Sequence, residues 1–158
     1  IKIHRPEVDW LIVSIHWGNE YLPSPETWRQ NLAHRLIDAG ADIIHGHHPH
    51  VWQGLEWIPR PRRAGARHCL AAYSLGNFVF DQKQPGTRET ALLRCALDRA
   101  GVREAQVIPL TIVRGRPQPS PPAAAERIQA ELGARSAALG APLAGDRVTM
   151  AGARSEGR

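Results

Sequence analysis

The chain has 158 residues, 42% of them hydrophobic, and carries a formal net charge of +5 at pH 7. This length is enough for the core of one domain but not comfortably for two. No apolar run approaches the roughly 18 residues that a membrane-spanning helix needs, and neither cysteine has zinc-ribbon spacing, so these residues contain neither a spanning helix nor a cysteine-based zinc site.

Two short apolar runs in the first third of the chain predict neighbouring parallel strands. Residues 9–16 form a nearly unbroken apolar run that ends in His16, as expected of a strand buried on both faces. Residues 42–45 form a second short strand. A helix between the two would complete one βαβ unit with a right-handed crossover.

The segment between these runs carries the start and stop signals of a helix. Ser24 can cap the helix, with Pro25 at its first position. Apolar side chains recur at helical spacing from Trp28 to Ile37, and Gly40 is suited to close the helix.

Short β-segments dominate the middle of the chain. The pattern predicts three short strands, one connecting loop and then a long antiparallel hairpin. The strands are 55–58, 68–74 and 77–80, the loop is 59–66, and the hairpin strands are 90–98 and 102–113. The sheet is therefore expected to end in antiparallel strands.

The end of the chain differs in composition from the rest. Residues 117–122 form a Pro-rich linker and residues 123–139 an Ala-rich helix, and the tail from Gly140 onward is expected to be loose. We therefore expect an α/β fold whose domain occupies residues 1–116, followed by an appended region at 117–158.

Five of the eight histidines lie at or just beyond the ends of the two N-terminal strands. They are His16, at the end of the first strand, and His45, His47, His48 and His50, around the end of the second. Strands of a βαβ unit end at the same edge of the sheet, where binding sites form. We therefore expect His16 to converge with the other four.

Neutral imidazole is a common metal ligand, so His16, His48 and His50 are the predicted metal ligands. Pro49 is expected to hold His48 in an extended conformation, and Gly46 to permit close approach of the backbone. Other interpretations remain open. Stacked or surface histidines would explain His48 and His50, and a buried histidine bonded to a carbonyl would explain His16.

The other polar residues near these strand ends are less clearly assigned. His47 is a candidate ligand or phosphate donor that lines the site, whereas His45 is expected to face the sheet as a structural residue. Glu20 either orients His16 or a substrate group or is a surface carboxylate, and Asp42 is expected to cap or pair locally. None of these carboxylates is placed to bridge two metal ions, as a two-metal site requires.

Gly76 and Asn77 are two further candidates for lining the site. A turn at Gly76 would present backbone N–H groups, and Asn77 offers both a donor and an acceptor. The alternative is a break in a strand, where Gly76 would permit a bulge. No residue is assigned as catalytic.

Eighteen of the 20 basic residues are arginine, and most are scattered along the chain. The single tight cluster is Arg60, Arg62, Arg63 and Arg67. A solvated surface explains most of these residues, and the cluster is a candidate patch for an acidic polymer. No nucleic-acid partner is predicted.

Three motifs resemble those of a known family. They are HWGNEY at 16–21, GHHPHV at 46–51 and YSLGNFVFDQ at 73–82. In this order they are similar to the motifs of the bacterial CapA/PgsA-type domain of poly-γ-glutamate capsule synthesis, over roughly residues 5–115. Because the chain starts at Ile1 and not at Met, we expect it to be the C-terminal part of a longer polypeptide.

That family is similar to the calcineurin-like metallophosphoesterases, which implies a fold and a metal site. The implied fold is a four-layered α/β sandwich, and this chain would supply its C-terminal half: one βαβ unit, antiparallel strands and a C-terminal helix. The implied cofactors are two divalent ions (Mn, Fe or Zn), with His16, His48 and His50 among their ligands. The motifs with the bridging Asp and the Asn-His pair do not occur in this sequence, so we expect the fragment alone to be inactive.

The resemblance implies a role in capsule biosynthesis at the cell envelope or extracellular face of bacteria. Two functions remain open. One is a metal-dependent, phosphoesterase-like hydrolase in the full-length protein. The other is a non-catalytic module that binds or transports an acidic polymer such as poly-γ-glutamate together with other capsule-synthesis proteins. Membrane association is expected only through a segment outside this sequence.

Overall fold

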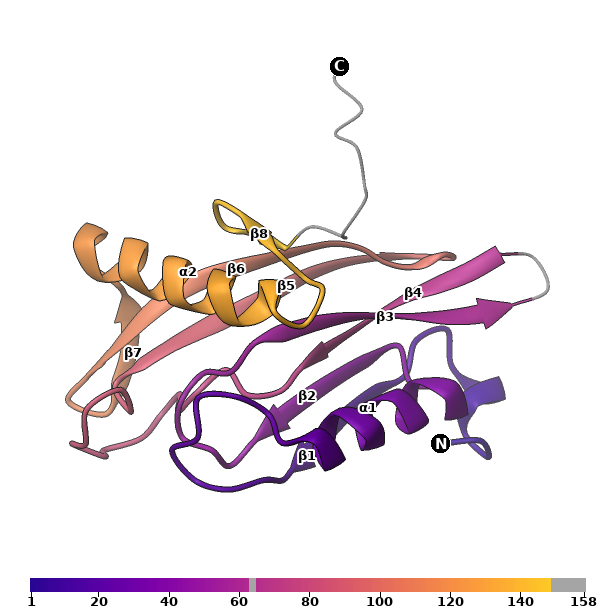
Figure 1. Cartoon of the computed structure of the whole chain (residues 1–158), viewed down its shortest axis with the longest axis horizontal. Helices are drawn as coiled ribbons and strands as arrows, with labels where there is room; N and C mark the ends of the chain where they lie inside the picture. Colours follow the sequence, from indigo (N-terminus) through magenta and orange to yellow (C-terminus); the bar gives the residue numbers. More distant parts are fainter. Residues whose placement is uncertain (63–64, 149–158) are drawn as a thin grey trace, which may run out of the picture.

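The computed structural model describes residues 1–62 and 65–148 as an α/β fold with one nine-stranded sheet and two α-helices (Figure 1). The predicted α/β class is therefore confirmed. In chain order the elements are a 3-10 helix (Arg5–Glu7), β1 (Ile12–His16), α1 (Thr27–Ala39), β2 (Ile43–His47), β3 (Leu55–Arg62), β4 (Gly65–Ala72), β5 (Glu89–Asp98), β6 (Gly101–Val113), β7 (Arg116–Pro119), α2 (Pro122–Ala137), β8 (Leu143–Ala144) and β9 (Arg147–Val148).

The sheet is parallel around β2 and antiparallel at its flanks. β2 lies between β1 and β4 and runs parallel to both. β4 forms an antiparallel hairpin with β3 and meets β6 through a single parallel pair, His68 with Gly101. The long β5–β6 hairpin continues the sheet, with β7 and β9 paired to β6 and β8 to β9. The parallel strand pair of the predicted βαβ unit and the predicted hairpin are both confirmed.

Adjacent residues of β2 and β4 face two different apolar cores. Ile44 and Ala71 belong to the core that contains buried residues of α1. Ile43 and Leu70, their neighbours in sequence, belong to the core that contains Ile128 of α2. Ile43 and Ile44 of β2, and Leu70 and Ala71 of β4, are therefore buried on opposite faces of the sheet, as expected of inner parallel strands.

β1 is much less buried than the sequence predicts. The run at 9–16 predicts a strand covered on both faces, which is wrong, because exposed and half-buried side chains alternate along β1. Ile12, for example, is 58% exposed. Among the described residues, β1 pairs only with β2 and forms an edge of the sheet. An apolar run therefore does not distinguish an edge strand from an inner strand.

Helix α1 begins later than predicted and ends as predicted. Its N-cap is Glu26, not Ser24, and no side chain caps the free N–H groups. The Glu26 carboxylate instead binds the guanidinium of Arg29, with 2.5 Å between Oε2 and Nε. Gly40 closes the helix with a φ of 128°, a conformation that favours glycine.

The predicted loop at 59–66 is largely strand, because β3 and β4 extend into one long hairpin. Pro59 and Pro61 of β3 pair with His68 and Ala66 of β4. Proline lacks a backbone donor and is tolerated in edge strands. Among the described residues β3 pairs only with β4, so both prolines lie in an edge strand.

Three other segments differ from the prediction. Residues 77–80 form no strand and instead belong to the loop between β4 and β5. Residues of the predicted Pro-rich linker form β7, and the predicted loose tail forms β8 and β9 up to Val148. The long strand β6 offers backbone partners to both segments, which the local composition does not reveal. The tail at 149–158 lies outside the described residues.

Asp42 is fully buried at the start of β2 and lies at the centre of an ion-pair network. Its carboxylate oxygens lie 2.9 Å from Arg60 Nη2, 2.6 Å from Arg67 Nε and 3.6 Å from Arg5 Nη2. The backbone N–H of Leu11 donates to the same carboxylate at 2.9 Å. The predicted local pairing of Asp42 is therefore wrong, because its partners come from three separate segments of the chain.

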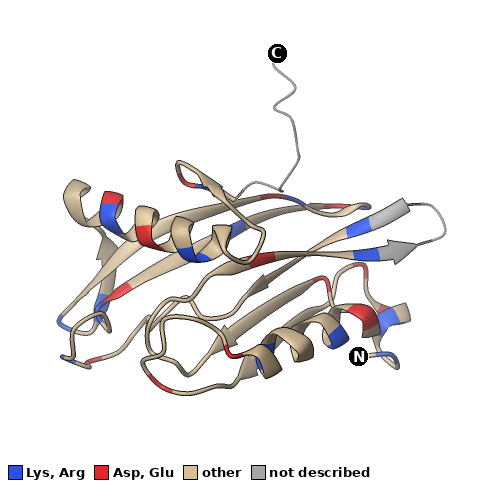
Figure 2. Cartoon of the chain, in the orientation of Figure 1, with Lys and Arg blue, Asp and Glu red and all other residues tan. Residues whose placement is uncertain are grey.

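The arginine cluster that the sequence predicts as a basic surface lies partly inside the fold. Arg60 and Arg67 are buried around Asp42, and the side chains of Arg62 and Arg63 lie outside the described residues. Elsewhere, basic and acidic residues are interspersed along the helices and strands (Figure 2). The two buried arginines therefore stabilise the fold and do not form part of a polymer-binding patch.

Ser136 links α2 to β3 and allows a test of this packing. Its buried Oγ accepts the N–H of Leu55 at 2.9 Å. Ser136→Ala would leave that amide without an acceptor, so we expect the free energy of unfolding to fall by about 1–3 kcal/mol. Urea denaturation followed by tryptophan fluorescence would measure the change. The control is Ser24→Ala, an exposed serine that does not cap α1, and an equal loss in this variant would contradict the explanation.

Candidate metal centre

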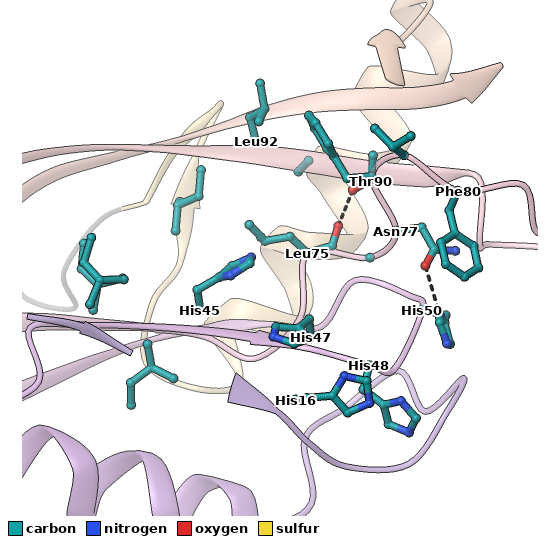
Figure 3. Close-up of a pocket in the computed structure, with 18 of the residues that line it drawn as sticks. His16, His45, His47, His48, His50, Leu75, Asn77, Phe80, Thr90 and Leu92 are labelled. Atoms are coloured by element: carbon teal, nitrogen blue, oxygen red, sulfur yellow. Dashed lines mark hydrogen bonds between the residues drawn. The ribbon is translucent and has the colours of Figure 1, made fainter. Parts of the chain in front are cut away.

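The ends of β1 and β2 bring the two groups of histidines together. His16 is the last residue of β1 and pairs in register with His47, the last residue of β2. His48 and His50 follow directly in the loop beyond β2. Figure 3 shows His16, His47 and His48 close together at this edge of the sheet, with His50 beside them. The predicted convergence of the histidines is therefore confirmed.

The loop that carries His48 and His50 has an unusual backbone. His48 has a φ of 103° and His50 a φ of 63°, both in the region that favours glycine. The predicted extended conformation of His48 before Pro49 is therefore wrong. Each such residue costs about 1–3 kcal/mol and persists only where its surroundings hold it, most often at functional sites. Here the carbonyl of Pro49 accepts the N–H of Tyr21 at 2.8 Å, which ties the loop to the segment after β1.

Gly46 precedes this loop and permits the predicted close approach. The indole Nε1 of Trp17 donates to the carbonyl oxygen of Tyr73 at 3.0 Å, directly over Gly46. A Cβ at position 46 would overlap with both of these atoms. Glycine is therefore required for β2 to pack beneath this hydrogen bond.

Three side chains converge closely enough to bind one cation. One ligand atom each from Glu20, His48 and His50 lies within 4.8 Å of the other two. Glu20 Oε1 is 3.8 Å from His50 Nε2, so the carboxylate faces His50 and not His16, which the sequence had suggested as its partner. This is the only such group of three among the described residues.

His16 lies beside this group of three. Its ring centroid is 4.3 Å from that of His48 and 5.1 Å from that of His47. The side chain is exposed, so the alternative of a buried histidine bonded to a carbonyl does not apply. Its role as a ligand stays a prediction, as do the roles of His48 and His50.

His45 and His47 occupy the inner side of the histidine cluster. Partial desolvation by neighbouring atoms lowers the pKa of both imidazoles, and for His47 the neighbouring His16, His45 and His48 lower it further. His45 was expected to be a structural residue facing the sheet, but it is exposed and lines a cavity together with His47 (Figure 3). Low imidazole pKa values favour the neutral form, which is the form that binds metal ions.

His16, His45, His47, His48 and His50 line a cavity of about 790 Å³. Gly76 and Asn77, which the sequence predicts to line the site, both line this cavity, and Gly76 has a φ of 81°. The rest of the wall is mainly apolar and includes Leu75, Phe80 and Leu92 (Figure 3). The polar groups in the wall of this cavity are therefore mainly imidazoles.

The donor atoms fit one divalent ion better than two. Two imidazoles and one carboxylate form a ligand set that suits Zn, Mn or Fe. A two-metal centre needs a bridging carboxylate and further oxygen ligands. Within the described residues no second group of candidate ligands accompanies Glu20, His48 and His50. Glu20, His48 and His50 would therefore hold one ion, and the two-ion site that the resemblance implies stays a prediction.

Comparison with known proteins identifies the family. The family model "Bacterial capsule synthesis protein PGA_cap" matches residues 1–82, which include all the histidines of the site and all three motifs. The chain belongs to this family. The PGA_cap resemblance of the three sequence motifs is thereby confirmed.

Relatives of this chain include proteins named for capsule biosynthesis. It is 41% identical over 115 residues to the capsule biosynthesis protein CapA of Bacillus anthracis, covering 73% of this chain and 26% of that protein. It is 39% identical over 115 residues to the PGA biosynthesis protein CapA of Bacillus subtilis (strain 168), covering 73% of this chain and 28% of that protein. A probable polyglutamine synthesis accessory protein of Mycobacterium tuberculosis is 37% identical over 82 residues, covering 52% and 20%.

The PGA_cap chain spans only about a quarter of the length of the two CapA relatives. Among the described residues, no helix is long and apolar enough to cross a membrane.

Some residues at the site were not found by sequence analysis. Thr87 and Gln82 hold Asn77 by hydrogen bonds, and Asn77 in turn contacts His50. Gln82 is the last residue of the third motif, and that position only weakly indicated a role at the site. Thr87 lies outside all three motifs, and no pattern in the sequence pointed to it.

Proposed function

We propose that this chain supplies the histidine-bearing part of a divalent-metal centre in a bacterial capsule-biosynthesis protein, and that the completed centre supports hydrolysis of a phosphoester or related bond. The observation that carries the proposal is the convergence of Glu20, His48 and His50, whose ligand atoms lie within 4.8 Å of one another. Membership of the capsule-synthesis family supports the biological role.

Each residue of the site has a specific part in this proposal. His48 and His50 hold the ion through neutral ring nitrogens, and Glu20 supplies negative charge that offsets the charge of the cation. When bound, a divalent ion would polarise a substrate oxygen and lower the pKa of a water molecule. His16 and His47 lie beside the ligands, where their ring N–H groups can donate to phosphoryl oxygens of a substrate.

The remaining ligands are proposed to come from outside this sequence. The described residues provide one group of three donors, whereas a two-ion site needs a bridging carboxylate. The CapA relatives are about four times as long as the part that this chain matches, which leaves ample sequence for those ligands. Catalysis is therefore proposed for the full-length protein, and metal binding for this chain.

Zinc binding tests the first part of the proposal. We expect isothermal titration of Zn²⁺ into the purified chain to show one saturable site, which His48→Ala or His50→Ala abolishes because each removes a ligand. The matched control is His34→Ala. The His34 ring lies outside the site and contacts the Glu56 carboxylate at 2.7 Å, so its removal should leave Zn²⁺ binding unchanged. Failure of the wild-type chain to bind Zn²⁺ or Mn²⁺ would reject the proposal.

Turnover tests the second part. In the full-length protein loaded with Mn²⁺ or Zn²⁺, we expect hydrolysis of a chromogenic phosphodiester that both His48→Ala and His50→Ala abolish. His34→Ala is again the control. A full-length protein that binds the metal but hydrolyses neither phosphomonoesters nor phosphodiesters would overturn the hydrolase assignment and leave metal binding intact.

A second candidate function is binding or transport of an acidic polymer such as poly-γ-glutamate, with other capsule-synthesis proteins as partners. The names of the PGA and polyglutamine synthesis relatives favour this ligand, and the net charge of +5 favours attraction to it. The names of the same relatives support a position at the cell envelope. Polymer binding that persists in the His48→Ala/His50→Ala double variant would favour this function, and loss of binding would count against it.

A further inference from the structure

We infer that Asn77 is a positioning residue that selects one tautomer of neutral His50, with the proton on Nδ1, so that the lone pair of Nε2 faces Glu20. The inference deepens the proposed metal centre and rests on it only for its effect on metal affinity. Its starting point is a hydrogen bond of 2.7 Å between Asn77 Oδ1 and His50 Nδ1 (Figure 3).

The orientation of the Asn77 amide is determined by the backbone. Asn77 Nδ2 lies 3.1 Å from the carbonyl oxygen of Thr87, and this oxygen can only accept a hydrogen bond. The NH₂ group must therefore face Thr87, and the amide oxygen must face His50. A second acceptor, Gln82 Oε1 at 3.0 Å, engages the other hydrogen of the same NH₂ group.

Thr87 is itself firmly held, so the amide is fixed by a rigid partner. Its side chain is buried, and its Oγ1 donates to the carbonyl of Gln84 at 2.8 Å. Asn77 is also buried, at 7% exposure. A reversed amide would place its oxygen against the Thr87 carbonyl and its NH₂ group against His50. That orientation would lose the hydrogen bonds to the Thr87 carbonyl and to Gln82 Oε1 and would set the amide oxygen against two other oxygen acceptors, which is costly in a buried environment.

The amide orientation then dictates where the imidazole carries its proton. Asn77 Oδ1 can only accept, so Nδ1 of His50 must donate. A neutral imidazole has one N–H, which leaves Nε2 with a bare lone pair. That nitrogen lies 3.8 Å from the carboxylate oxygen of Glu20, so two electron-pair donors face each other. Such a pair is stabilised by a cation between them, and fixed ring orientation is the usual role of a hydrogen-bonding partner behind a metal-binding histidine.

Aromatic neighbours hold the His50 ring in this orientation. The ring of Tyr21 stacks on it, with 6.0 Å between centroids and an interplanar angle of 29°, and the ring of Phe80 lies 5.3 Å away. Gln82 connects the two sides of the site, because its Nε2 donates to the Tyr21 hydroxyl at 3.2 Å. Rotation of the His50 ring away from Asn77 would therefore disturb the packing of Tyr21, Phe80 and Gln82.

The tautomer can be observed directly without a metal. In the metal-free chain at about pH 8, where an ordinary imidazole is neutral, long-range ¹H–¹⁵N correlation should show the proton of His50 on Nδ1. The His50 signals are assigned as those that disappear in His50→Ala. Asn77→Ala should redistribute the proton towards Nε2, whereas Asn77→Asp keeps an acceptor and should retain it on Nδ1. Asn31→Ala, at an exposed asparagine of α1, is the matched control and should leave the tautomer unchanged.

Metal affinity provides the second readout. Asn77→Ala is expected to weaken Zn²⁺ binding by about ten- to a hundredfold, the usual effect of losing such a partner, with Asn31→Ala close to wild type. A wild-type His50 protonated on Nε2, or a tautomer that Asn77→Ala does not change, would overturn the inference even if Zn²⁺ binds. A proton on Nδ1 that shifts in Asn77→Ala supports the inference even if the chain binds no Zn²⁺, which would instead reject the proposed function.

Discussion

Replacing Asp42 with alanine is expected to lower the free energy of unfolding by about 3–5 kcal/mol, because removal of one partner leaves buried charges unpaired. The carboxylate is fully buried and contacts Arg60 and Arg67, which are themselves buried, and it also accepts the N–H of Leu11. Urea denaturation of the purified chain, followed by circular dichroism, would measure the loss.

A surface ion pair provides the control for Asp42. Glu104 lies 3.5 Å from Arg147, with side chains that are 40% and 66% exposed. Because exposed pairs contribute little, Glu104→Ala should change the free energy of unfolding by less than about 1 kcal/mol. Similar losses in the two variants would show that the buried network contributes no more than an exposed pair.

Replacing Gly46 with alanine is expected to destabilise the chain by about 3 kcal/mol or more, because the added methyl group overlaps with backbone that cannot easily move. The Cβ would overlap with the Tyr73 carbonyl oxygen and the Trp17 Nε1, which are hydrogen-bonded to each other at 3.0 Å. Relief of the overlap requires loss of that buried hydrogen bond. Thermal and urea denaturation of the purified variant would measure the effect.

Gly133 offers a matched glycine for comparison. It lies within α2, and a Cβ there would meet the Cβ of Leu143 at 3.6 Å, an ordinary contact. Alanine favours a helix over glycine by about 0.8–1.0 kcal/mol, so Gly133→Ala should leave stability unchanged or raise it. A Gly46→Ala variant as stable as Gly133→Ala would contradict the close packing at β2.

The location of the histidine cluster could be predicted from the sequence because local patterns decide it. The apolar runs mark strands, and a parallel pair of strands must end at one edge of a sheet. His16 and His47 are accordingly paired partners at the ends of β1 and β2. Local sequence patterns also predicted the β5–β6 hairpin and the end of α1 at Gly40.

The interactions that complete the site could not be predicted, because they depend on residues far apart in sequence. Asn77 meets His50 across 27 positions and is oriented by a backbone carbonyl, which carries no sequence signal. The backbone of His48 adopts a φ that the following proline disfavours, held there by tertiary contacts. The partners of Asp42 were missed for the same reason, since arginine composition does not distinguish buried residues from exposed ones.

The two ends of the short strand β2 belong to different parts of the structure, a buried ion-pair network and the histidine cluster. The buried network of Asp42 lies at its start, and the histidine loop follows its end. Six residues of extended chain place Asp42 and His48 on the order of 20 Å apart. Substitutions so far apart usually have independent effects on free energy. Substitutions in the histidine loop can therefore change the site at one end of β2 without compensating changes in the buried network at the other end.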